Sequence, residues 1–275
     1  TCCCFFIVRV RQRPAPKRSS ASSDVDKGQL EDGDIVEVLK ERVGGKPVIY
    51  LFSPIELPSV NVALTLCNEW EYSAVYPLAR INQSDEGEST INWNVATKKN
   101  GELVENSTGL ELSYLFWEAE TLSTSNPAPV NDDNNNFRPA HANVDATNSI
   151  VLPFSDFISY LNLTLKSLTL HTSARNDFIT YWLPHFVKIN ERGQLIAFRF
   201  LPQIAYEKSA QLNVTPRPDV VTRVFMLFKG VDREEENSFE IKTQDINWRN
   251  VVGVNDEAMD ESLFRVLEWG GMEVV

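Results

Sequence analysis

The chain has 275 residues, of which 43% are hydrophobic and 23% are charged, and its formal net charge is -12. This composition is ordinary for a globular protein with a substantial core. A surface this acidic repels the phosphates of nucleic acid, so we predict no nucleic-acid partner, and no stretch approaches the roughly 20 apolar residues of a transmembrane segment.

The first 33 residues differ from the rest of the chain. Residues 1–23 carry five basic side chains and no acidic one, and apolar periodicity is missing as far as Gly33. Such a segment cannot repay its ordering entropy, so we predict a flexible basic N-terminal arm and linker over residues 1–33. The arm resembles a mitochondrial transit peptide and has three adjacent cysteines that could accept palmitate, so any membrane contact is expected here.

Beyond the arm, Cys67 is the only cysteine, so the body cannot form a disulfide of its own, which slightly favours a cytoplasmic location. Residues 34–45 predict a short helix or a linker, because apolar side chains recur near one helical face before Gly44 and Gly45. A single α+β domain is expected over residues 46–275.

The segment 48–52, VIYLF, predicts a strand that is buried on both faces, and we expect it to be the central strand. Residues 59–66 alternate apolar and polar side chains, as in a half-exposed antiparallel strand, and we expect them to pair with 48–52 through the turn SPIELP. A further strand is expected over 71–77. A hairpin at Asn100-Gly101 follows, and residues 110–120 continue the strand pattern.

Residues 121–149 form an Asn-, Asp- and Pro-rich segment that is either a functional flap or disordered, and we favour disorder. Two helices are expected next, over 153–170 with Ser155 as N-cap and over 173–188 with Pro184 kinking or ending the helix. Strands resume in 193–202, 210–215 and 219–230. The predicted fold class is therefore α+β, a mainly antiparallel sheet or sandwich with a pair of helices packed on it.

Five short motifs, in this order along the chain, carry a resemblance: KPVIYLF (46–52), YLFWE (114–118), DFITYWLP (177–184), VTRVFM (221–226) and EWGG (268–271). With them the chain resembles a family of uncharacterised proteins of bacteria and fungi. The chain departs from the family pattern at Ser53, which is an extra residue before Pro54. The resemblance implies no known activity and no catalytic residues.

The pattern YLFWEAE supplies the candidate catalytic residues. In a strand, Glu118 and Glu120 share one face and lie about 7 Å apart, at twice the strand rise. Paired carboxylates near an aromatic ring can hydrolyse a glycosidic bond when one is protonated and the other ionised. Asp177 and Glu268 are the other candidates for the second carboxylate, and two solvated acids on an exposed strand face are the simpler alternative.

Aromatic side chains suggest a different kind of site. A stacking platform for sugars or a groove for a peptide could be built from aromatic rings, whose simpler role is to fill the core. The candidate ligand-binding residues are Tyr114, Trp117, Tyr181, Trp182 and Trp269.

Other chemistry has no support in the sequence. The histidines and cysteines show no metal-ligand spacing, the acidic run DDNNN lacks the glycine and glutamate of a calcium loop, and neither a nucleophile elbow nor a phosphate loop occurs. We therefore predict no metal and no cofactor. The favoured function is a non-catalytic recognition or interaction protein with an aromatic and acidic surface that binds a protein or glycan. The alternatives are a hydrolase that uses Glu118 and a self-associating structural protein.

Overall fold

The computed structural model describes residues 47–122, 136–239, 243 and 246–274. The expected arm and linker over 1–33, the expected helix over 34–45 and residues 123–135 of the long loop lie outside these ranges. The described residues belong to one compact unit, within residues 42–275.

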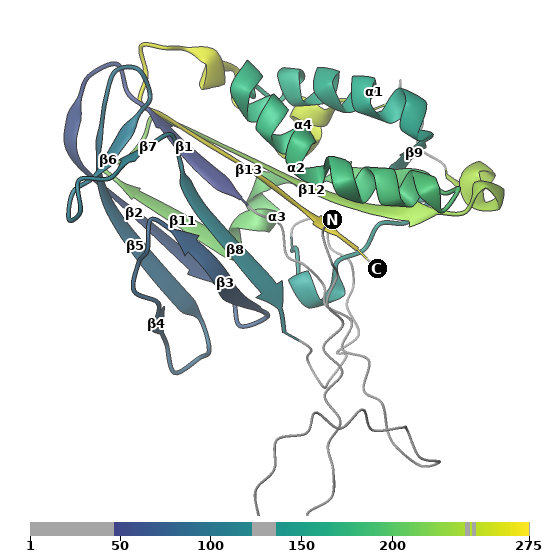
Figure 1. Ribbon diagram of the computed structural model, residues 1–275, viewed down its shortest axis with the longest axis horizontal. Coiled ribbons are helices and arrows are strands. Elements are labelled where there is room, and N and C mark those ends of the chain that lie inside the picture. The colour runs from purple at the N-terminus through teal and green to yellow at the C-terminus, as the bar shows by residue number, and fades with distance from the viewer. Residues whose placement is uncertain (1–46, 123–135, 240–242, 244–245, 275) are drawn as a thin grey trace, which may run out of the picture. The chain divides into compact units, whose positions relative to one another are not determined.

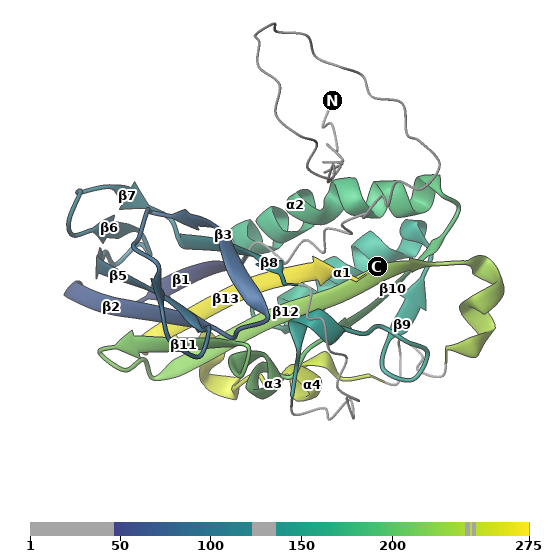
Figure 2. The ribbon, with the colours of Figure 1, turned by 90° about the horizontal axis from the view of Figure 1, so that it is seen from below.

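Sheet A has seven strands, and β13 lies at its centre (Figure 2). β1 is buried along most of its length, as expected, but it is not the central strand, because it lies between β8 and β13. Neighbouring strands are antiparallel except for the parallel pair β12 and β13. The spatial order is β3 (Trp70–Tyr76), β8 (Leu115–Thr121), β1 (Val48–Phe52), β13 (Arg265–Glu273), β12 (Val220–Val231), β10 (Leu195–Phe200) and β9 (Ile150–Leu152).

Sheet B has six strands, and its long strand β2 buries the four alternating apolar side chains that the sequence pattern indicates. The predicted pairing of 48–52 with 59–66 is wrong, because the chain passes from sheet A to sheet B between β1 and β2, and β2 pairs with β5 and β11 instead. The order is β11 (Ala210–Thr215), β2 (Leu57–Leu66), β5 (Ser89–Thr97), β6 (Leu103–Glu105) and β7 (Glu111–Leu112), with β4 (Asn82–Gln83) also on β5.

The expected hairpin joins β5 to β6, and Gly101 has the positive φ angle of 86° that its turn requires. Residues 110–120 do not form one strand: β7 belongs to sheet B and β8 to sheet A.

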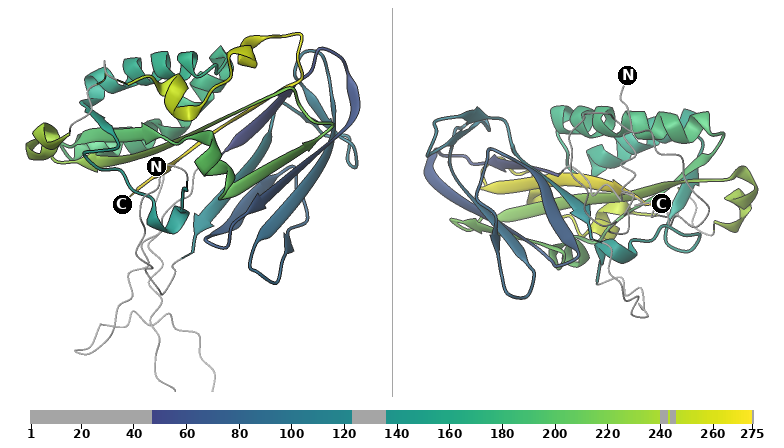
Figure 3. Two further views of the ribbon diagram at one scale, coloured as in Figure 1. Left: turned by 180° about the vertical axis from the view of Figure 1, so that it is seen from behind. Right: turned by 60° about the horizontal axis from the view of Figure 1, so that its bottom comes forward.

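The helices α1 (Phe154–Ser167) and α2 (Thr172–Glu191) cover one face of sheet A, and sheet B covers part of the other face (Figures 1 and 3). The predicted α+β class and the predicted helix pair are thus confirmed. Ser155 is not the N-cap of α1, since the helix begins after Pro153 without a side-chain cap. Pro184 lies inside α2 and does not end it. The shorter helices are η1 (Pro139–His141), α3 (Gln203–Glu207), η2 (Arg233–Ser238), α4 (Trp248–Val252) and η3 (Asp256–Met259).

Two apolar cores follow from this layering, one between the sheets and one between sheet A and the helices. All six tryptophans belong to these cores, with at most 4% of each exposed. Tryptophan therefore contributes little to any exposed aromatic surface. None of the helices in the described ranges is both long enough and apolar enough to cross a membrane.

The expected disorder of the long loop is wrong for its described part, residues 136–149, which packs against the body. Phe137 and Val144 are buried in the core between the sheets. Glu69, which is also buried, accepts hydrogen bonds from the Arg138 guanidinium and from the Ala140 backbone N–H, the latter at 3.1 Å. An ion pair and an aromatic anchor thus hold this segment in place.

Candidate functional site

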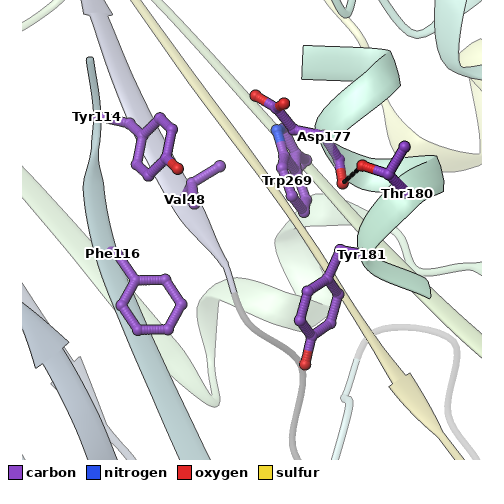
Figure 4. A pocket seen from close by; sticks show the side chains of 7 residues that line it. All are labelled: Val48, Tyr114, Phe116, Asp177, Thr180, Tyr181 and Trp269. Carbon is purple, nitrogen blue, oxygen red and sulfur yellow. Dashed lines mark hydrogen bonds between the residues drawn. The ribbon is translucent and has the colours of Figure 1, made fainter. Parts of the chain in front are cut away.

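A pocket of about 310 Å³ opens between α2 and the strands β1, β8 and β13 (Figure 4). It forms on the helix side of sheet A, where β8 diverges from the helices that lie above β12 and β13 (Figure 1). Its walls are mainly aromatic and apolar. The lining residues are Val48, Tyr114, Phe116, Asp177, Thr180, Tyr181 and Trp269.

The strand side of the pocket follows from alternation along β8. Tyr114 directly precedes β8, and with Phe116 and Glu118 it occupies alternate positions that face the helices. The positions between and after them, Leu115, Trp117 and Ala119, face sheet B. Val48 of β1 pairs directly with Trp269 of β13, so these two side chains enter the pocket side by side.

Two residues of α2 form the helix side of the pocket, because they lie beside the row of buried side chains on that helix. Phe178 and Trp182 belong to that row and are fully buried against sheet A. Asp177 and Tyr181 directly precede them, one turn apart, and so flank the row on the side that faces β8. Thr180 lies at the rim, where its hydroxyl donates to the backbone carbonyls of Asn176 at 2.7 Å and Asp177 at 3.4 Å.

A buried tyrosine holds the carboxylate at one end of the pocket. Tyr50 Oη donates a hydrogen bond of 3.4 Å to Asp177 Oδ2, and the Tyr50 ring packs edge-on against Tyr114 at 5.5 Å. Burial raises the pKa of Tyr50 well above its ordinary value. Tyr50 therefore keeps its proton and remains a donor to Asp177. The indole N–H of Trp269 partly offsets this rise in the Tyr50 pKa. Trp269 Nε1 nevertheless makes no hydrogen bond of normal geometry.

Glu118 does not line the pocket, but its charge acts on Tyr181, which does. Burial raises the pKa of Tyr181 above its ordinary value, and the negative charge of Glu118 raises it further. Tyr181 is accordingly neutral and presents its ring to the pocket, on the side facing Phe116 (Figure 4).

The candidate catalytic residues do not form one group. Glu268 lies on the other face of sheet A, fully buried, where it pairs with Arg223 and accepts a hydrogen bond of 3.0 Å from Trp117 Nε1. The sheet itself separates it from Glu118. Glu120 is exposed on β8, across from Glu71 of β3, and of the four candidates only Asp177 lines the pocket.

The candidate ligand-binding residues divide in the same way. Tyr114, Tyr181 and Trp269 line the pocket, as the sequence suggests. Trp117 and Trp182 do not, because Trp117 fills the core between the sheets and Trp182 fills the core under α2, with 1% and 0% exposed.

Four residues of the site lack a distinctive sequence signal. Val48 and Tyr50 belong to a strand that is apolar on both faces, and Phe116 and Thr180 stand beside more conspicuous residues. The strand alternation through Tyr114, Phe116 and Glu118 is the one signal that could have identified Phe116.

Metal ligands do not gather in the described residues, where no group of three or more His, Cys, Asp or Glu side chains could hold an ion. His185 is bound to Glu273, with 2.7 Å between Nδ1 and Oε2, and His171 caps the N-terminus of α2.

Comparisons of the chain with protein-family models, with curated proteins and with solved structures each find no match. The family resemblance of the five motifs stays a prediction. The function of the pocket must therefore be argued from its own geometry.

Proposed function

We propose that the protein is a non-catalytic recognition domain that binds its ligand in the pocket between β8 and α2. One observation carries this proposal: four aromatic rings and a single carboxylate line the same concave pocket. Its volume of about 310 Å³ lies at the lower end of the range of roughly 300–1,000 Å³ that small-molecule sites occupy. A pocket of this kind accepts a small ligand, or one side chain or sugar of a larger partner.

The alternative of a hydrolase requires two carboxylates on either side of one bond, about 5 to 9.5 Å apart. Asp177 lines the pocket and Glu118 does not, so the described lining supplies a single carboxylate. This arrangement favours recognition over acid-base hydrolysis. Self-association stays a further prediction, for which the edge strands β3 and β11 are the surfaces to examine.

A fragment screen by ligand-observed NMR tests the proposal. Thr180→Trp places an indole at the exposed rim of the pocket and should abolish binding by filling it. Asn190→Trp is the matched control, because Asn190 is also exposed on α2 but lies near the C-terminal end, away from the pocket. We expect hits that bind the wild-type protein and the Asn190→Trp variant but not the Thr180→Trp variant. A screen in which no hit is sensitive to Thr180→Trp would contradict the proposed function.

A further inference from the structure

We infer that the ligand of this pocket carries an organic ammonium group, an inference that rests on the proposed function. The rings of the lining come from both sides of the opening. Tyr114 and Phe116 approach from β8, and Tyr181 and Trp269 approach from α2 and β13 (Figure 4). The negative face of an aromatic ring attracts a cation, and several such rings around one opening are the usual means of binding a substituted ammonium.

The charges around the pocket have the sign that a cation requires. Asp177 contributes a carboxylate to the lining, and none of the seven described lining residues is basic. Two basic side chains of the elements that form the pocket interact with other groups: the guanidinium of Arg175 in α2 donates to Leu170 O at 2.8 Å, and that of Arg265 in β13 lies over the Phe52 ring at 5.5 Å. The net charge of -12 adds a long-range attraction of the same sign.

The hydrogen-bonding groups of the pocket argue against other ligand classes. A phosphate or carboxylate ligand would need basic side chains or free backbone N–H groups, and it would be repelled by Asp177. A sugar would need donors and acceptors all around its hydroxyl groups, whereas the lining offers the Tyr114 and Tyr181 hydroxyls and the Asp177 carboxylate, since the Thr180 hydroxyl already donates to backbone carbonyls. One carboxylate with four rings suits a compact, weakly hydrated cation.

Choline and its uncharged isostere 3,3-dimethylbutan-1-ol provide a matched pair of probes, because they share shape and apolar surface but differ in charge. Titrated into the full chain, choline should bind at least about tenfold more tightly than the isostere. Asp177→Asn, which keeps the size of the side chain, should remove most of that difference by weakening choline alone. Equal affinities for the two probes, or an unchanged choline affinity in Asp177→Asn, would overturn the inference.

These outcomes are distinct from a failure of the proposed function. If the two probes bind equally and Thr180→Trp abolishes both, the pocket is a binding site but its ligand is not an ammonium. If neither probe binds while neutral fragments do, the ammonium inference again fails alone. If nothing binds in a manner sensitive to Thr180→Trp, both proposals fail.

The same chemistry could come from a free amine or from the side chain of a protein, and a peptide with one trimethyllysine separates these sources. If the trimethyllysine peptide binds more tightly than choline and the unmethylated peptide does not bind, the natural ligand is a protein side chain. Measurable binding that is no tighter than that of choline and is lost from the unmethylated peptide would identify a free small molecule. Either result supports the ammonium group, whereas equal binding of peptides carrying trimethyllysine and an uncharged norleucine would contradict it.

Discussion

Arg223 and Glu268 form an ion pair across the parallel strands β12 and β13, with 2% and 0% of their side chains exposed. They are direct neighbours in the register of the two strands. Arg223 also binds Glu207 and lies over the Tyr206 ring at 4.3 Å. Two charges buried between the sheets are tolerated because each is neutralised and hydrogen-bonded by the other.

Replacing Glu268 by Gln should therefore destabilise the protein severely. The change leaves the Arg223 charge buried with only the partly exposed Glu207 as its counter-ion, and the expected loss in free energy of unfolding is about 3–5 kcal/mol. Urea denaturation measures this loss. Glu111→Gln, which breaks the exposed pair with Lys98, should change the midpoint little. The double variant Arg223→Met with Glu268→Leu should recover much of the loss, and if it does not, the stranded charge is not its cause.

Glu105 should make stability depend on acid pH. Hydrogen bonds from Thr108 and Ser107 lower the pKa of Glu105 from 4.5 to about 2. Because its pKa is lower in the folded state, Glu105 contributes its full stabilisation above about pH 4.5 and loses it as the pH falls towards 2. Glu105→Gln should thus be less stable than wild type at pH 7, with a difference that shrinks towards pH 2. A difference that is constant between these pH values would exclude the carboxylate as its source.

Glu69 should control the accessibility of residues 136–142. It pairs with Arg138 and accepts the Ala140 N–H, while Phe137 packs against Trp70 at 5.7 Å. Glu69→Gln removes the ion pair, so chymotrypsin should cleave after Phe137 several times faster. Glu71→Gln, at an exposed position of β3, is the control and should leave the cleavage rate unchanged. Equal rates in all three proteins would show that the apolar anchor alone holds the segment.

Tyr50 should act as a positioning residue for Asp177 rather than as a contact of the ligand. Tyr50→Phe removes only the hydroxyl that donates to Asp177 Oδ2, so the carboxylate loses a fixed orientation. We expect choline to bind roughly threefold to tenfold more weakly and the uncharged isostere to bind as before, by calorimetric titration. Equal weakening of both probes would instead indicate that the change disturbs the pocket as a whole.

Local patterns in the sequence predicted the strands and helices better than they predicted pairing. The alternation of apolar and polar residues predicted β2, and the helical spacing of apolar residues predicted α1 and α2. Each of these patterns depends only on the element itself and on the side that it buries. The neighbours of β1 could not be predicted this way, since its partners are β8 and β13, far along the chain. The same limit applies to Glu268, whose burial depends on Arg223 in another strand.

The pocket was predicted in part. Tyr114, Asp177, Tyr181 and Trp269 were singled out as aromatic or acidic residues in suggestive motifs, and the fold brings these four together. Trp117 belongs to the same motif as Tyr114 but faces the opposite side of the strand. Which side of a strand faces a helix is set by the other layers of the fold, and no local pattern contains that information.

The position of β13 determines when this protein can fold. Val48 pairs with Trp269, residues that the chain separates by most of its length. On the ribosome, β1 emerges before β13 and stays without this central partner until β13 has been made. Sheet A can close only after that, by a contact of very long range, and contacts of this kind slow folding in general. In the meantime the apolar segment VIYLF is exposed, and it is the part of the nascent chain that a chaperone would have to shield.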